Sequence, residues 1–201
     1  MLLLLAILLW CVLGVALLHL IAGRPPGGQV GQALAQGCPL DPGEAGLVFE
    51  TWTLELEACV SVPVWDIEGT GRGPATVLIH DWGEAPLALL NRANQLTATC
   101  SRIIVPCLRG HCPGSGRCRL GRAERNDLKL LIDHLDEPVA VEGRGMGRYI
   151  VEGVNAREKI ASVMSEDPWR DPRDGLIRIM AARGFPAWPI VPLTMLFMHG
   201  R

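Results

Sequence analysis

Length, composition and charge narrow the classes of protein to which this chain can belong. Its 201 residues suffice for one domain plus an anchor or a tail. The 19 basic and 21 acidic residues leave a formal net charge of −2, which gives no reason to expect nucleic acid as a partner. With 23 glycines and 15 prolines, the chain fits a loop-rich α/β domain better than a helical bundle.

The cysteines number seven, which is odd, so they cannot all pair with one another. Cys11 also lies inside an apolar segment, where it would find no partner. We therefore expect mostly reduced, structural thiols. The alternative is a zinc site, because Cys107, His111, Cys112 and Cys118 lie close together in the sequence and zinc accepts such ligands.

Residues 2–22 are almost wholly apolar, with His19 as the polar interruption. About 20 such residues span the hydrocarbon core of a bilayer as a helix. A cleaved signal peptide is the alternative, but no Lys or Arg precedes the run and the small residues of 33–35 lie too far downstream. We therefore predict an uncleaved, single-pass membrane anchor over residues 1–23. Arg24 is the only nearby flanking charge, so the orientation stays open.

The composition changes twice after the apolar run. Residues 24–46 are rich in Pro, Gly, Gln and Ala and are typical of a linker, here one that lifts a domain off the membrane. Residues 48–56 alternate with a period of two, which predicts a strand. Residues 58–67 are expected to form its antiparallel partner. The domain is therefore expected to occupy residues 47–201.

A series of strands and helices follows, and its alternation predicts a parallel sheet. Strands are expected at residues 75–79, 102–105, 139–141 and 159–164, and helices at residues 87–96, 122–135, 149–155 and 176–183. The final segment, residues 185–198, is apolar but is broken by prolines and is too short to span a membrane.

A glycine-rich turn separates the third of these strands from the next helix. Gly143, Gly145 and Gly147 stand at alternate positions, which suits a tight turn with positive φ and close packing. The turn resembles the nucleophile elbow, G-x-S-x-G, of the α/β-hydrolase superfamily. Gly145 occupies the position of that family's catalytic serine. A Rossmann-like G-x-G turn is the rival interpretation of so short a pattern.

The order of the neighbouring motifs strengthens the resemblance, which covers roughly residues 47–169. His80 matches the His-Gly pair that ends the corresponding strand in the family, and Asp81 replaces the glycine. The resemblance assigns the backbone N–H groups of Trp82 and Met146 to the oxyanion hole. Asp81 would repel negative charge that develops there, or it caps the helix that follows.

The resemblance also implies a complete architecture. It is an α/β fold of the α/β-hydrolase type, with a mostly parallel sheet, leading antiparallel strands and the N-terminal transmembrane helix in front. The loop at residues 106–116 resembles the family's D-x-R-G-x-G-x-S loop, with Cys107, Cys112 and Gly114 at its Asp, Gly and Ser positions. Residues 176–201 would be the start of a lid over the active site.

The chemistry that the resemblance implies is incomplete in this chain. The family's triad runs Ser, then acid, then His, and Gly145 supplies no nucleophile. His199, the only histidine after the elbow in this sequence, is expected to be a frayed terminal residue rather than a base. Asp167, Asp171 and Asp174 fit loop and helix-cap roles. The sequence therefore predicts a decayed or incomplete relative of esterases or acyl hydrolases, without catalytic activity and without a cofactor.

Two other functions stay open. The first is a membrane-tethered binding module that uses the residual pocket for a small acyl or ester ligand, or for an anion between Arg144 and Arg148. The second is a zinc-binding domain built on the cysteine cluster. Other serines, Ser115, Ser162 and Ser165, lack the elbow context that a nucleophile needs.

Overall fold

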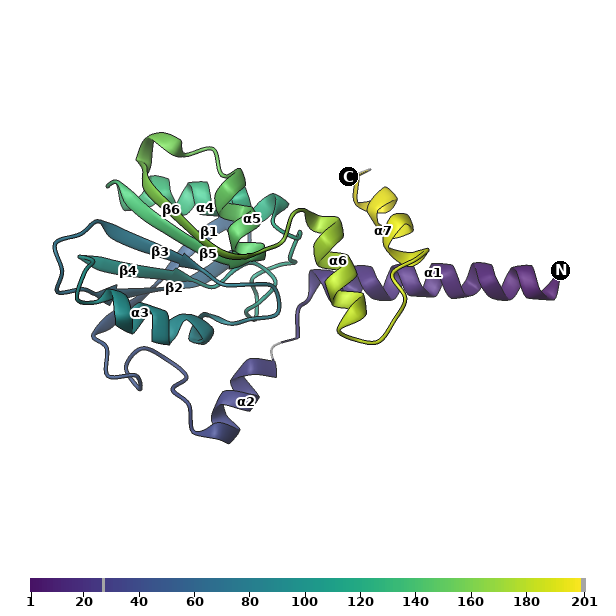
Figure 1. Cartoon of the computed structure of the whole chain (residues 1–201), viewed down its shortest axis with the longest axis horizontal. Helices are drawn as coiled ribbons and strands as arrows, with labels where there is room; N and C mark the ends of the chain where they lie inside the picture. The colour runs from purple at the N-terminus through teal and green to yellow at the C-terminus, as the bar shows by residue number, and fades with distance from the viewer. Residues whose placement is uncertain (27, 200–201) are drawn as a thin grey trace.

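The computed structural model of the protein describes residues 1–26 and 28–199 and shows an α/β domain with a long N-terminal helix (Figure 1). Its strands are β1 (Phe49–Glu57), β2 (Val60–Glu68), β3 (Ala75–Ile79), β4 (Arg102–Pro106), β5 (Val139–Gly145) and β6 (Ile160–Pro168). Its helices are α1 (Leu2–Gly23), α2 (Gly28–Gln36), η1 (Pro86–Leu89), α3 (Leu90–Leu96), α4 (Arg122–Leu135), α5 (Met146–Gly153), η2 (Arg157–Lys159), α6 (Pro172–Ala181) and α7 (Ile190–His199).

The six strands form one mixed sheet in the order β1-β2-β4-β3-β5-β6. β1 pairs antiparallel with β2, and β2 pairs antiparallel with β4, whereas β4, β3, β5 and β6 run parallel. The predicted sheet, mostly parallel with leading antiparallel strands, is thereby confirmed. Because parallel strands end at a common edge, the loops after β3 and β5 lie side by side there.

Helices cover both faces of the sheet, which explains why β3 is buried along its whole length. α4 packs on one face through the apolar stripe predicted for it, which includes Leu128, Leu131 and Ile132. α5 lies on the same face, and α3 covers the opposite face, where Ala93 joins the smaller core cluster.

The end of α1 is docked directly on the domain. The carbonyl of Ala22 accepts a hydrogen bond from Trp82 Nε1 at 3.1 Å, and that of Gly23 accepts one from the backbone N–H of Cys118 at 2.9 Å. The rest of α1 is apolar and largely exposed. This helix of 22 residues is long and apolar enough to cross a membrane, a property that it shares with signal sequences.

Residues 24–46, whose composition is typical of a linker, contain the helix α2 and a series of turns. The contacts of Ala22 and Gly23 place the start of this segment beside the domain. Its expected role as a spacer between a membrane and the domain stays a prediction.

The segment expected to start a lid forms α6 and α7. Asp171 caps α6 by accepting the N–H of Asp174 at 2.8 Å, so the expected cap role is confirmed for Asp171. α7 lies beside α1 (Figure 1). A Cβ on Gly14 of α1 would come within 2.6 Å of Ile190 Cδ1, so the glycine permits this close approach. The apolar C-terminal segment therefore packs on the N-terminal helix.

Candidate functional site

β5 passes into α5 through a sharp turn at Gly145, whose φ of 56° and ψ of −119° are strained for any residue with a side chain. A Cβ on Gly143 would lie 2.6 Å from the carbonyl carbon of Gly147. A Cβ on Gly147 would lie 2.3 Å from the carbonyl oxygen of Ile79. These glycines allow α5 to begin against β3 and β5, as the elbow resemblance implies.

The carboxylate of Asp81 lies against this turn. Its Oδ1 accepts the backbone N–H of Trp82 and that of Met146, both at 2.6 Å. These are the two N–H groups that the resemblance assigns to the oxyanion hole, and they meet on one oxygen atom. The alternative in which Asp81 caps the next helix is wrong, because that helix begins at Pro86 with Ala85 as its N-cap and no side-chain cap.

Asp81 also occupies the space that a side chain at residue 145 would need. A Cβ built on Gly145 would lie 2.0, 2.1 and 2.1 Å from the carboxyl carbon and the two oxygens of Asp81. A serine at residue 145 and the present position of Asp81 therefore exclude one another. Burial raises the pKa of Asp81, while the hydrogen bonds from Met146 and Trp82 act in the opposite direction.

An ion pair holds the chain beside Asp81. Arg144 Nε donates to Glu84 Oε2 at 3.0 Å, and its Nη2 donates to Glu84 Oε1. Glu84 Oε2 also accepts the backbone N–H of Asp81 at 3.0 Å. Arg148 pairs instead with Glu152, one turn further along α5. The anion site considered between Arg144 and Arg148 is therefore not assembled, because both arginines pair with glutamates and the turn already holds Asp81.

Two buried histidines lie behind the turn. His80 Nε2 accepts the N–H of Leu108 at 3.2 Å, so its Nδ1 carries the proton and donates to the carbonyl of Asp81 at 2.8 Å. His111 is held in the same way, and its Nε2 accepts the N–H of Gly83 at 3.1 Å. Burial lowers the pKa of His80 to about 4 and that of His111 to about 3. Both rings are neutral at pH 7 and fully bonded to backbone, so neither is placed to act as a general base.

The cysteine cluster considered as a zinc site is not brought together. Cys107 and Cys112 form a disulfide, and Cys118 is buried against Met146. Among the side chains that the structure describes, no group of three or more His, Cys, Asp or Glu residues could hold a metal ion. The expectation of reduced thiols holds for the other five cysteines and fails for this pair. The loop turns back sharply enough to bring the Cα atoms of Cys107 and Cys112 within 6.5 Å.

The remaining candidate residues have structural roles or cannot be placed. Ser115 is buried, and its Oγ donates to the carbonyl of Cys112 at 2.6 Å and accepts the N–H of Gly110 at 2.9 Å. Ser162 is exposed on β6, away from the elbow. The side chains of three further candidates lie outside the described part of the protein: Ser165, Asp167 and His199.

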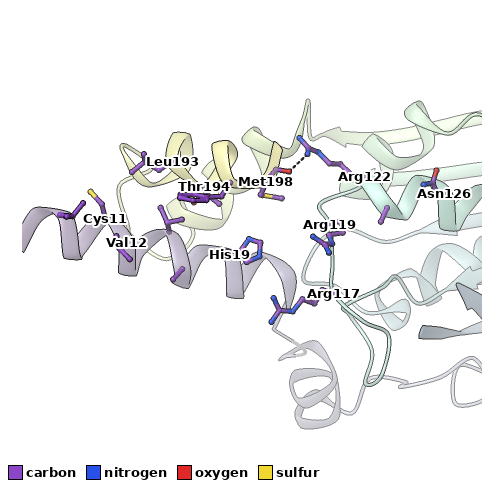
Figure 2. A pocket seen from close by; sticks show the side chains of 15 residues that line it. Cys11, Val12, His19, Arg117, Arg119, Arg122, Asn126, Leu193, Thr194 and Met198 are labelled. Atoms are coloured by element: carbon purple, nitrogen blue, oxygen red, sulfur yellow. Dashed lines mark hydrogen bonds between the residues drawn. The ribbon is translucent and has the colours of Figure 1, made fainter. Parts of the chain in front are cut away.

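A large cavity lies apart from the elbow, between α1, α7 and the start of α4 (Figure 2). Its volume is about 900 Å³, and its polar end is formed by Arg117, Arg119 and Arg122. The sequence interpretation missed this cavity because it treated residues 2–22 as an isolated anchor. In the sequence, the only indication of this cavity was the run of closely spaced arginines at residues 117, 119 and 122.

The comparisons with known proteins concern the fold. No family model and no curated protein matches the chain. Among solved structures, the esterase Pf2001 of Pyrococcus furiosus is similar with a TM-score of 0.58 and 16% identity, over 80% of this chain and 65% of the esterase. A mutant of a Pseudomonas aeruginosa protein, described as an epoxide hydrolase, is similar with a TM-score of 0.52 and 22% identity, over 65% of this chain and 44% of that protein.

These similarities, together with the strand order, show that the chain has the α/β-hydrolase fold. The chain spans 65% of the esterase and less than half of the other protein, at 44%. Function must be argued from the site itself, since a fold of this kind supports many activities.

Proposed function

We propose that this chain is a membrane-anchored α/β-hydrolase-like protein of esterase or acyl-hydrolase ancestry that does not catalyse hydrolysis. The observation that carries the proposal is the position of the Asp81 carboxylate. It accepts both N–H groups of the elbow at 2.6 Å and fills the space of a side chain at residue 145. Gly145 itself has no atom that could attack a carbonyl.

Hydrolysis through an elbow needs backbone donors that are free to bind the oxyanion as it forms. Here Trp82 and Met146 already donate to a carboxylate oxygen of the same chain. A substrate oxyanion would have to displace this group, and the two negative charges would repel one another at close range. The nearest buried histidine, His80, has both ring nitrogens bonded to backbone. Nucleophile, oxyanion hole and base are thus each compromised independently.

The solved structures with similar folds support the proposed ancestry, because one is an esterase and another is described as an epoxide hydrolase. The apolar helix α1 supports the anchoring part of the proposal. An alkaline carbonate wash of membranes from expressing cells tests the anchoring directly. An anchored chain stays with the membranes, whereas release into the wash would refute the anchor.

Ester turnover tests the catalytic part of the proposal. The full chain in detergent is assayed with p-nitrophenyl butyrate as wild type, as Gly145→Ser and as Asp81→Gly/Gly145→Ser. We expect none of the three to exceed a heat-denatured sample. We also expect Gly145→Ser to be the least stable, because the new side chain clashes with Asp81, and the double variant to regain only part of the lost stability, because it also lacks the Asp81 acceptor. Turnover by the wild type or by Gly145→Ser would refute the proposal.

A binding role is the second candidate, and one observation favours it. The large cavity of the described structure lies between the anchor and the domain rather than at the elbow. A membrane-tethered binding module would therefore use this cavity, whereas Asp81 fills the elbow where a small acyl or ester ligand was expected. The further inference concerns the ligand of this cavity.

A further inference from the structure

The cavity between the N-terminal helix and the domain, which we call the anchor groove, has two apolar walls (Figure 2). Val12 and Val15 of α1 form part of one wall, and Leu193 and Phe197 of α7 form part of the other. Its volume of about 900 Å³ lies within the range of cavities that enclose a small-molecule ligand. An apolar chain would fit between these walls.

The other end of the anchor groove is basic. Figure 2 shows Arg117, Arg119 and Arg122 gathered where the groove meets the domain. Arg122 Nη1 donates to the carbonyl of Met198 at 3.1 Å, which joins this end to α7. Arg117 and Arg119 are exposed, and within the described residues neither side chain has a carboxylate partner. Among the described residues that line the groove, none is acidic.

A buried carboxyl supports the loop that carries these arginines. Glu124 Oε1 accepts the backbone N–H of Arg119 at 2.7 Å. Its side chain is fully buried, and this burial raises its pKa. This hydrogen bond holds the backbone of the loop at Arg119, while the side chains of Arg117 and Arg119 are exposed.

The length of the anchor groove matches one leaflet of a bilayer. Its lining residues on α1 run from Leu8 to His19, which is about 16 Å at the rise of an α-helix. The hydrocarbon core of a bilayer is about 30 Å thick, so half of it is about 15 Å. With α1 across the membrane, the apolar walls lie at the depth of acyl chains and the arginines lie at the depth of headgroups.

We propose that the anchor groove binds one anionic phospholipid from the leaflet next to the domain, with an acyl chain between α1 and α7 and its phosphate at Arg117 and Arg119. Guanidinium groups form charge-assisted hydrogen bonds with phosphate, and the described residues that line the groove include no carboxylate that could bind the ammonium of a zwitterionic lipid. The assignment rests on the membrane-anchoring part of the proposed function.

Native mass spectrometry of the full chain in detergent tests the headgroup site, with phosphatidylglycerol and phosphatidylcholine of identical acyl chains as probes. We expect the wild type to retain phosphatidylglycerol preferentially. The variant Arg117→Gln/Arg119→Gln should bind it at least about tenfold more weakly. The matched control Arg72→Gln/Lys129→Gln removes two exposed cations elsewhere on the domain and should bind as the wild type does.

A second pair of variants tests the apolar end with the arginines intact. Val12→Trp places a large side chain in the groove and should abolish lipid retention. Leu9→Trp makes a similar change at an exposed position of α1 outside the groove and should not.

Three results would overturn the assignment. The first is equal retention of phosphatidylglycerol and phosphatidylcholine by the wild type. The second is an equal loss of lipid binding in a variant and in its matched control. The third is displacement of the lipid by inorganic phosphate at a similar concentration. The carbonate wash separates the two proposals. A chain that is washed off the membrane refutes the anchor, whereas a chain that stays in the membrane and binds both lipids alike refutes only the groove assignment.

Discussion

One carboxylate oxygen of Asp81 accepts hydrogen bonds from both backbone donors of the elbow turn, the N–H groups of Trp82 and Met146. Glu84 and Arg144 hold the backbone beside it. Asp81 thus stabilises a turn whose N–H groups would otherwise lack an acceptor within the protein.

This role predicts different stabilities for two substitutions. Asp81→Ala leaves the N–H groups of Trp82 and Met146 without their acceptor and should cost about 1–3 kcal/mol of unfolding free energy. Asp81→Asn keeps an acceptor oxygen and should cost less. Urea unfolding of the full chain in detergent, followed by tryptophan fluorescence, measures both. Added acetate should stabilise Asp81→Ala and leave the wild type unchanged; equal midpoints for the two variants would contradict the role.

The lowered pKa values of His80 and His111 predict that the free energy of unfolding falls in mild acid. Their pKa values drop from 6.5 to about 4 and about 3 on folding, so the unfolded chain takes up these protons first. The stability that they confer is present above pH 6.5 and is lost as the pH falls toward these lower values. Between pH 7 and pH 5 each should cost about 2 kcal/mol. Asp81 opposes the trend, because its raised pKa favours the folded state in acid.

Urea unfolding of His111→Gln over the same pH range isolates this effect. The substitution should lower the dependence of stability on pH by about one proton. The same dependence in the wild type and in His111→Gln would show that His111 carries its proton in the folded state as well.

At the scale of elements, a single arginine ties the loop after β4 to α4. Arg109 Nε and Nη2 donate to the two carboxylate oxygens of Asp127, both at 2.6 Å, and its Nη1 donates to Glu57 at 2.7 Å. The Arg109 and Asp127 side chains are only 11% and 13% exposed, so this pair is shielded from solvent. The loop that carries His111 therefore depends on α4 for its position.

The ion pair between Arg109 and Asp127 predicts that two aspartates of α4 contribute differently to the free energy of unfolding. Asp127→Ala leaves a mostly buried guanidinium with Glu57 as its remaining carboxylate partner and should cost about 3 kcal/mol of unfolding free energy. Asp133→Ala removes an exposed pair with Lys129 and should change stability little. Thermal unfolding in detergent compares them, and similar losses for both variants would refute the proposed anchoring of the loop.

At the scale of the whole molecule, β6 is an edge of the sheet, and within the described residues its pairing partner is β5. Its residues 161–164 are exposed, and the side chains of Val163 and Met164 are 48% and 56% accessible. An exposed apolar edge strand can pair with another copy of itself. We therefore expect self-association of the chain through β6.

A charge on this edge should reduce that association. Val163→Lys is expected to slow aggregation of the concentrated full chain in detergent while changing the unfolding free energy by less than about 0.5 kcal/mol. Light scattering over time measures it. Leu130→Lys, at an exposed apolar position of α4, is the matched control and should aggregate as the wild type does. Equal protection by both variants would point to general solubility rather than to the sheet edge.

Most of the secondary structure could be predicted, since periodicity and glycine placement are local signals. The boundaries differ where a tertiary contact extends an element. α5 begins at Met146 rather than at Tyr149, because the elbow leads straight into a helical turn. β6 reaches Pro168, beyond the expected end at Met164, because it continues to pair with β5. α2 was not expected, because its composition is typical of a linker.

The sequence by itself determined the apolar helix, the alternation of strands and helices, and a turn in which Gly145 leaves no nucleophile. These depend on hydrophobic periodicity and on backbone freedom, which neighbouring residues encode. Only the tertiary structure decided that Asp81 binds Met146, 65 residues away, and that α1, α7 and the arginines enclose a groove. Such contacts depend on strand order and helix docking, which arise from packing between distant segments and leave no local pattern in the chain.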